Sequence, residues 1–147
     1  LTVNGGSSSG AAAGAQAGDA GNIQLTPGGF AHVSSTIQMN GGDVTTTAAG
    51  ATAGDGGILL HTSTVPILLF GSISGNGGAA SASDGPFAGG QGGTLQAAPG
   101  TANDIVLGKG TYSIRGGNGT RGGGNGGAIT CEGQSSDVIF SGSLDTR

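Results

Sequence analysis

The stretch GDGGILLHTSTVPILLFGSISGNGG, residues 54–78, places short apolar segments between two glycine clusters. Its Ile and Leu residues lack the i, i+3, i+4 spacing of an amphipathic helix. Pro66 follows three polar or β-branched residues and marks a turn between the two apolar segments. We therefore predict two short strands, each separated from the rest of the chain by glycine.

The same features recur at a fixed interval along the 147 residues. The pattern G-x-x-G begins at residues 18, 54, 90 and 124, at intervals of 36, 36 and 34. The triplet N-G-G begins at Asn4, Asn40 and Asn76, and its fourth position holds Arg115-Gly116-Gly117. A fixed period of this length indicates a repeat architecture. We divide the single domain into units 1–6 (partial), 7–42, 43–78, 79–117 and 118–147.

The apolar residues follow the same period and define columns of equivalent positions. These columns are Ile23, Leu59, Leu95 and Ile129; Leu25, His61, Ala97 and Cys131; Ala31/Val33, Ile67/Leu69, Ile105/Leu107 and Val138/Phe140; and Ile37, Ile73, Ile114 and Leu144. An insertion near Lys109-Gly110-Thr111 accounts for the longer third unit. Equivalent strands of successive units can stack in parallel and bury these columns. The predicted fold is an all-β parallel β-solenoid of about four 34–36-residue repeats with glycine-rich loops.

The glycine clusters are predicted to form the corners of the coil, where a positive φ favours glycine. The Gly/Ala/Ser segments between the strands are expected to pack on the flank of the solenoid or to project as polyproline II-like strands. Asn4, Asn40 and Asn76 occupy one column, which favours a left-handed turn residue over a ladder of stacked side-chain amides.

The composition restricts the possible partners. Glycine contributes 36 residues, the formal net charge is −4, and only 8% of residues are charged. The four basic residues are Lys109, Arg115, Arg121 and Arg147. This low positive charge argues against binding to nucleic acid or to an anionic membrane. The single cysteine, Cys131, cannot form an intrachain disulfide, and no apolar run is long enough for a membrane span.

Few residues offer catalytic or metal-binding chemistry. His61 and Cys131 share a column but lie two coils apart, so His61 does not activate the thiol. Asp19 and Asp55 align with Gln91 and Asn125, which favours turn capping over a calcium site. The acids are Asp19, Asp43, Asp55, Asp84, Asp104, Glu132, Asp137 and Asp145. With four basic residues, they do not provide the carboxylate and arginine cluster of pectin-lyase-type β-helix enzymes. We expect no catalysis, no metal and no cofactor.

Of three further functional patterns, two are incomplete. Thr45-Thr46-Thr47 resembles the start of an ice-binding threonine ladder, but Ser81-Ala82-Ser83 stands one period later. The glycine clusters lack the G-K-[ST] that would follow in a phosphate-binding loop. Asn118-Gly119-Thr120 is a glycosylation sequon. Ice binding remains the main alternative function, and polysaccharide processing the weaker one.

The phrases GGQGGTLQAAPGTANDIVLGKGTYSIRGG (89–117) and GGNGGAITCEGQSSDVIFSGSLDTR (123–147) share one order of glycines, strand, polar turn and strand. This order resembles the glycine-rich β-helical repeats of bacterial secreted and surface proteins, such as filamentous-haemagglutinin-like adhesins and autotransporter passenger domains. The resemblance implies an extracellular or cell-surface location and a structural or adhesive function, with a glycan or another surface ligand as a possible partner.

The two ends of the sequence resemble interrupted units. Leu1-Thr2-Val3-Asn4 matches the last strand of a preceding unit, and Ser143–Arg147 stops before the next glycine pair. Solenoids need polar caps at their ends. We expect either continuation of the same chain or end-to-end self-association into a filament.

Overall fold

The computed structural model describes residues 1–10, 13–27, 31–46, 49–63, 66–81, 88–99, 105–120, 122–132 and 137–147. In these ranges the chain forms short parallel strands and no helix. The first sheet contains β1 (Ser8–Gly10), β5 (Val44–Thr46) and β9 (Ala80–Ser81). The second contains β2 (Ile23–Leu25), β6 (Ile58–Ser63), β10 (Thr94–Pro99) and β13 (Ala128–Cys131). The third contains β3 (Ala31–Val33), β7 (Ile67–Leu69), β11 (Ile105–Leu107) and β14 (Val138–Phe140). The fourth contains β4 (Ile37–Gln38), β8 (Ile73–Ser74), β12 (Thr111–Ser113) and β15 (Ser143–Asp145).

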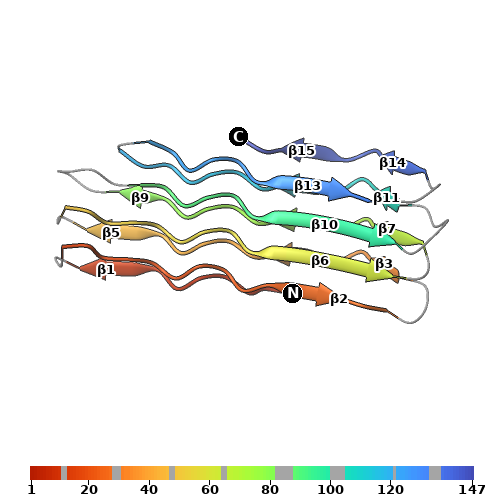
Figure 1. Ribbon diagram of the computed structural model, residues 1–147, viewed down its shortest axis with the longest axis horizontal. Coiled ribbons are helices and arrows are strands. Elements are labelled where there is room, and N and C mark those ends of the chain that lie inside the picture. The colour runs from red at the N-terminus through yellow and green to blue at the C-terminus, as the bar shows by residue number, and fades with distance from the viewer. Residues whose placement is uncertain are drawn as a thin grey trace.

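Within every sheet, neighbouring strands come from successive units of the sequence. The coils stack on one another and form a flattened slab whose long dimension follows the strands (Figure 1). The predicted all-β parallel solenoid is therefore confirmed. Each coil runs through the fourth and first sheets in one layer, returns through the second sheet in the other, and is closed by the third sheet.

The strand register confirms most of the predicted columns. Ile23 pairs with Leu59, Leu59 with Leu95, and Leu95 with Ile129. His61 lies between Leu25 and Ala97 in the next column.

The prediction for the last column was wrong in the third unit, where Tyr112 and not Ile114 pairs with Ile73. The extra residues enter at two places: Pro99 pairs with Ser63 36 positions earlier, Ile105 with Ile67 38 earlier, and Tyr112 with Ile73 39 earlier. Tyr112 and Ile114 both point inward because strand side chains alternate, so apolar periodicity alone did not distinguish them.

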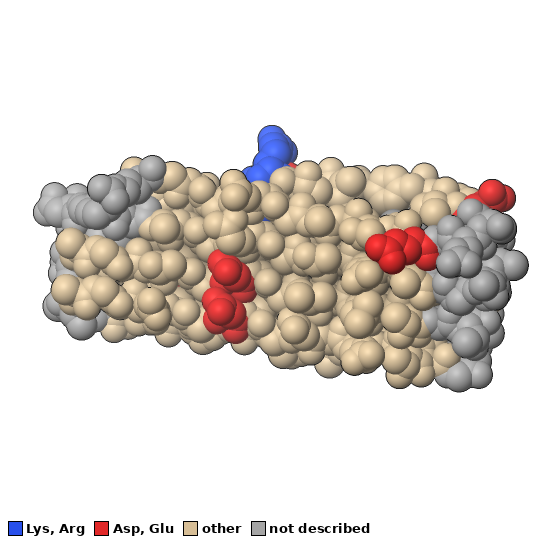
Figure 2. Space-filling model, in the orientation of Figure 1, with Lys and Arg blue, Asp and Glu red and all other residues tan. Residues whose placement is uncertain are grey.

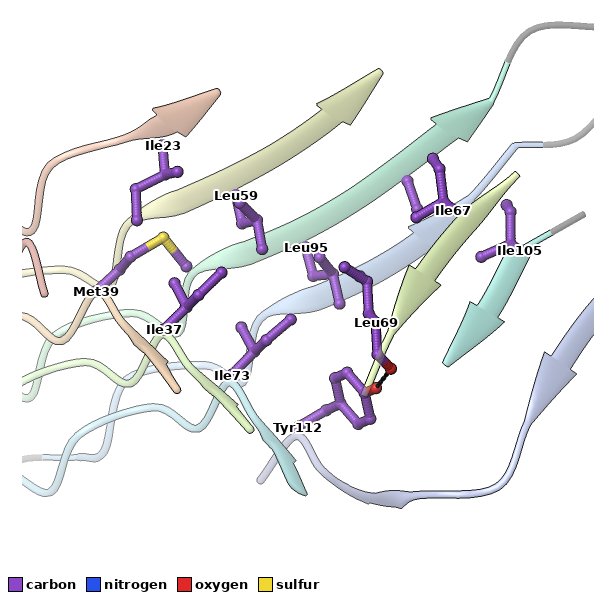
Figure 3. Close-up of a cluster of buried hydrophobic side chains, with 11 residues drawn as sticks. Ile23, Ile37, Met39, Leu59, Ile67, Leu69, Ile73, Leu95, Ile105 and Tyr112 are labelled. Carbon is purple, nitrogen blue, oxygen red and sulfur yellow. Dashed lines mark hydrogen bonds between the residues drawn. The ribbon is translucent and has the colours of Figure 1, made fainter. Parts of the chain in front are cut away.

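The main hydrophobic core lies where the second, third and fourth sheets face one another (Figure 3). Ile23, Leu59 and Leu95 project from one sheet towards Ile37, Ile73 and Tyr112 from another (Figure 3). The third sheet closes this core with Ile67, Leu69 and Ile105. The inner members of the column, Leu59 and Leu95, are 0% and 1% exposed. Stacking one coil on the next therefore removes these branched side chains from water, which is the main stabilising contribution.

The other half of the slab, which we call the wing, has a core of small side chains. Val44, Ala51, Ala53 and Ala80 are buried there. Gly14 and Gly50, with φ of 71° and 81°, lie at the turn between the two layers of this wing. The described parts of the Gly/Ala/Ser segments thus belong to the solenoid, with small side chains between the two layers.

Between the wing and the main core, the two layers meet at a glycine seam, which we define as Gly6, Gly18, Gly42, Gly54, Gly78, Gly90, Gly117 and Gly124. Backbone hydrogen bonds cross this seam: Gly42 N–H donates to Gly18 O at 3.0 Å, and Gly78 N–H donates to Gly54 O at 2.8 Å. A Cβ on Gly90 would lie 1.9 Å from the carbonyl oxygen of Gly54.

The seam corrects the prediction that the N-G-G and G-x-x-G glycines form corners. Within the described part of the chain, a positive φ occurs at Gly14 and Gly50, outside both patterns. Between stacked coils the patterned glycines are needed because two backbone layers lie in contact there, which leaves no space for a side chain. Gly6, in the first coil, has open space beside it.

Candidate binding face and the other candidate residues

One broad side of the slab carries outward-facing hydroxyl and amide side chains in register. Ser9, Thr45 and Ser81 form one exposed column along β1, β5 and β9. A second column follows the fourth sheet and contains Thr36, Ser72, Thr111 and Ser143. Beside it, Gln38 pairs with Ser74 and Ser74 with Ser113. We call the outward side chains of this layer the polar face.

A ladder of asparagine side chains runs through the polar face. The Asn4 Oδ1 accepts the backbone N–H of Asn40 at 2.9 Å, the Asn40 Oδ1 accepts that of Asn76 at 3.0 Å, and the Asn76 Oδ1 accepts that of Arg115 at 2.9 Å. Serine hydroxyls join this network: Asn76 Nδ2 donates to Ser74 Oγ at 3.0 Å, and Ser113 Oγ donates to Asn76 Oδ1 at 2.8 Å. The column is therefore a side-chain-to-backbone ladder, whereas the sequence pattern favoured a turn.

The aligned acids form a second ladder of the same kind. Asp19 Oδ1 accepts the N–H of Asp55 at 2.9 Å, Asp55 Oδ1 accepts that of Gln91 at 2.7 Å, and Gln91 Oε1 accepts that of Asn125 at 2.9 Å. These oxygens bind backbone donors of the next coil. Among the described residues no group of three His, Cys, Asp or Glu side chains is placed to hold a metal ion. Asp19 and Asp55 line a shallow cavity of about 200 Å³.

His61 is buried in the core, as its column predicted, and is 1% exposed. Its Nδ1 has no hydrogen-bond partner within the described part of the structure. Burial lowers the pKa of His61 below its ordinary value, so the ring is neutral near pH 7. His32 lies on the surface with its ring edge-on to Phe70, at a centroid distance of 5.3 Å.

Cys131 does not form a nucleophilic site with His61. The register places Ala97 between the two residues, so they stand two coils apart. Burial raises the pKa of the Cys131 thiol, which disfavours the reactive thiolate.

The charged residues are dispersed, apart from one cluster at the last coil. Asp145 contacts Arg147 at 3.3 Å and Arg115 at 3.5 Å. The hydrogen bond from the Arg147 side chain is the main cause of the lowered pKa of Asp145. This carboxylate is therefore ionised and paired, which does not suit a general acid. Asp84, Asp104 and Arg121 lie outside the described residues.

The surface is otherwise almost uncharged. Figure 2 shows one broad side of the slab with acidic side chains at a few separate points and basic side chains confined to one edge. Asn118, the first residue of the sequon, is exposed. In the described part of the chain, no helix is long and apolar enough to cross a membrane.

Sequence reasoning missed two of these features. By residue type Ser81 breaks a threonine ladder, but in the structure its hydroxyl continues the column of Ser9 and Thr45. The glycine seam was also missed. The 36-residue spacing of Ser9, Thr45 and Ser81 was the available signal for the first feature.

No protein-family model matches the chain, and no curated protein matches it. Among solved structures, a nine-helix polyproline type II bundle antifreeze protein from the springtail Granisotoma rainieri aligns over 95% of this chain and 94% of its own length. The identity is 18% and the TM-score is 0.25. A likeness this weak carries no argument about function.

Proposed function

We propose that the chain is an extracellular, non-catalytic scaffold whose polar face adheres to the hydroxyl-rich surface of a glycan. The observation that carries this proposal is the in-register arrangement of Ser9, Thr45 and Ser81 beside the serine and asparagine columns. The extracellular location rests on the resemblance of the glycine-and-strand phrases to secreted bacterial repeats.

Hydroxyl and amide groups suit an uncharged, hydroxyl-rich ligand because each can both donate and accept hydrogen bonds. Parallel strands place equivalent side chains about 4.8 Å apart along the stack. The ladder holds Ser74 and Asn76 in fixed positions, so little side-chain entropy is lost when a ligand binds. An extended polymer can contact several coils at once, which multiplies weak individual contacts.

Retention of the chain on insoluble polysaccharides, measured by co-sedimentation, tests the proposal. A triple variant with Ser9→Ala, Thr45→Val and Ser81→Ala should lose at least about tenfold in affinity, since three interfacial hydrogen bonds of about 1 kcal/mol are removed. A matched variant with Gln24→Ala and Gln96→Ala alters the side of the slab carrying β2 and β10 and should bind as the parent does. Equal retention of all three proteins would overturn the proposal.

Ice binding is the second candidate, and the hydroxyl column at Ser9, Thr45 and Ser81 is the observation that favours it. An ordered array of exposed hydroxyls presents a regular lattice of hydrogen-bonding groups. Two measurements, of thermal hysteresis and of polysaccharide retention, distinguish ice binding from glycan adhesion. Thermal hysteresis with altered ice-crystal shape, abolished by Thr45→Val, supports ice binding, whereas polysaccharide retention without hysteresis supports adhesion.

A further inference from the structure

The last coil leaves apolar side chains exposed at positions that the inner coils bury. Val138, Phe140 and Leu144 are 48%, 44% and 51% exposed. The partners of Val138 and Leu144 one coil earlier, Ile105 and Tyr112, are both 0% exposed. The strands β13, β14 and β15 therefore form an exposed edge whose side chains are apolar, like those between the inner coils.

The first coil leaves the complementary opening. A cavity of about 440 Å³ lies between β2 and β3 and is lined by Gln24, Leu25, Thr26, Pro27, His32, Val33 and His61. Leu25 and Val33 are only half-buried, although Ala97 and Leu69 in the same columns are fully buried. The core is thus open at this edge, and apolar side chains of a further coil would fill it.

The side-chain ladders give the stack a direction. In each ladder, the oxygen belongs to the earlier coil and the backbone N–H to the later one, as for Asp19 with Asp55 and Gln91 with Asn125. In the ladder of Asp19, Asp55, Gln91 and Asn125, the next acceptor after the last coil would be the side-chain oxygen of Asn125. At the first coil, the equivalent donor position of the same ladder is the backbone N–H of Asp19.

We propose that the edge of β13, β14 and β15 binds the first coil of a second copy of this chain, head to tail. In the register of the inner coils, Ile129 stacks on Ile23 of the second copy and Phe140 on its Val33. Cys131 then lies against Leu25 and closes the open cavity. The contact continues the coil-to-coil interface already present three times within the second sheet.

Head-to-tail stacking is favoured over contact between two like edges. Two last edges brought together would oppose their ladder oxygens, and neither would supply the backbone donors that the ladder uses. A head-to-tail contact joins different surfaces and leaves both outer edges open, so it extends into a filament. This inference does not depend on the glycan or ice ligand.

Two edge variants test the direction of assembly. One carries Val138→Lys and Leu144→Lys on the last coil, and the other carries Leu25→Lys and Val33→Lys on the first coil; a charge on an edge strand opposes pairing. In sedimentation velocity, the parent chain should assemble with increasing concentration, and each variant alone should remain monomeric. Mixed, the two variants should form a dimer and nothing larger, because only one compatible pair of edges remains. Thr45→Lys on the polar face is the control and should assemble like the parent.

A crosslinking experiment tests the register and does not require lysine at the interface. Stacked residues on neighbouring strands lie about 4.8 Å apart, within the Cα separation of a disulfide. Mild oxidation of Leu25→Cys should therefore link position 25 of one copy to Cys131 of another and give a ladder of oligomers. A parent chain that stays monomeric at high concentration would overturn the proposal. So would assembly of the Val138→Lys, Leu144→Lys variant at the parent level, or oxidation that yields only Cys131–Cys131 dimers.

Discussion

The backbone N–H of Gly54 donates a 3.0 Å hydrogen bond to the carbonyl oxygen of Gly42, which lies in the opposite layer of the slab. The Gly54 carbonyl oxygen in turn accepts the N–H of Gly78 at 2.8 Å. The seam is therefore a continuous series of backbone hydrogen bonds that alternates between the layers as it ascends the coils. It explains why glycine recurs with the period of the fold.

Substitution of a seam glycine that lies between stacked coils should be strongly destabilising. A Cβ on Gly54 would lie 2.0 Å from the carbonyl oxygen of Gly18, and backbone cannot move aside as a flexible side chain can. Gly54→Ala should reduce the free energy of unfolding by about 3 kcal/mol or more. Gly6→Ala is the matched control, because a Cβ added there would have no other atom within 4 Å. Its effect on the free energy of unfolding should stay within about 0.5 kcal/mol in urea denaturation. Equal effects at both sites would contradict the claim that backbone contact at Gly54 excludes a side chain.

The buried hydroxyl of Tyr112 should contribute to stability through one hydrogen bond. It donates to the carbonyl oxygen of Leu69 at 2.6 Å, and the side chain is 0% exposed. Tyr112→Phe removes this bond, while the Leu69 oxygen keeps the backbone N–H of Gly108 at 2.7 Å. The free energy of unfolding should therefore fall by about 1 kcal/mol, the net contribution of one hydrogen bond. Thr111→Val, at the exposed neighbouring position, provides the comparison in the same urea titration. A Tyr112→Phe protein as stable as the parent would show that the hydrogen bond is not formed.

Tyr112 is the single tyrosine of the chain, so its ionisation can be followed directly by ultraviolet absorbance. Burial, with a smaller effect of Cys131, raises the pKa of Tyr112 to about 12 from its ordinary value of 10.0. The folded chain then holds the phenol proton more tightly than the unfolded chain. Stability should be complete below pH 10.0 and should decline as the pH rises towards about 12. Tyrosinate absorbance that appears near pH 10.0 in the folded protein would contradict this burial.

His61 should make the fold sensitive to acid. Its lowered pKa means that the unfolded chain binds a proton more readily than the folded chain below pH 6.5. Stability is then complete above this pH and falls as the pH decreases towards the folded-state pKa. His61→Leu, which copies Leu25 of the same column, should abolish the histidine-dependent decline in thermal unfolding measured between about pH 5 and 7. His32→Gln, at an exposed position, should retain the decline.

The asparagine ladder should depend on the side-chain oxygen. The Asn40 Oδ1 accepts the N–H of Asn76 at 3.0 Å and also the Ser74 hydroxyl. Asn40→Ala removes this acceptor and should cost about 1 kcal/mol of stability in urea denaturation. Asn40→Asp keeps an oxygen in place, as Asp19 and Asp55 do in the other ladder, and should restore most of that loss. Equal losses for both variants would show that the oxygen is not the stabilising group.

Sequence periodicity predicted the second sheet well and the fourth sheet less well. Ile23, Leu59 and Leu95 keep a 36-residue spacing, so their pairing was evident from the sequence. Tyr112 was missed because the third unit gains residues in two places, and neighbouring inward positions were then equally apolar. The hydroxyl column was missed because Ser81 differs from threonine as a residue type. Its geometric equivalence to Thr45 appears only with the register.

The repeated spacing was sufficient to establish a parallel stack of coils, because in such a stack each strand finds its partner one period away. It did not show how the two layers of a coil meet, since two residues that meet across the seam, such as Gly42 and Gly54, are not one period apart in the sequence. Gly42 and Gly54 are adjacent only when both layers are folded, and the absence of a side chain there has no apolar or polar signature. The polar face, like the seam, is determined by the tertiary structure. Its columns become a surface only when the inward side chains of the same strands are buried in the core.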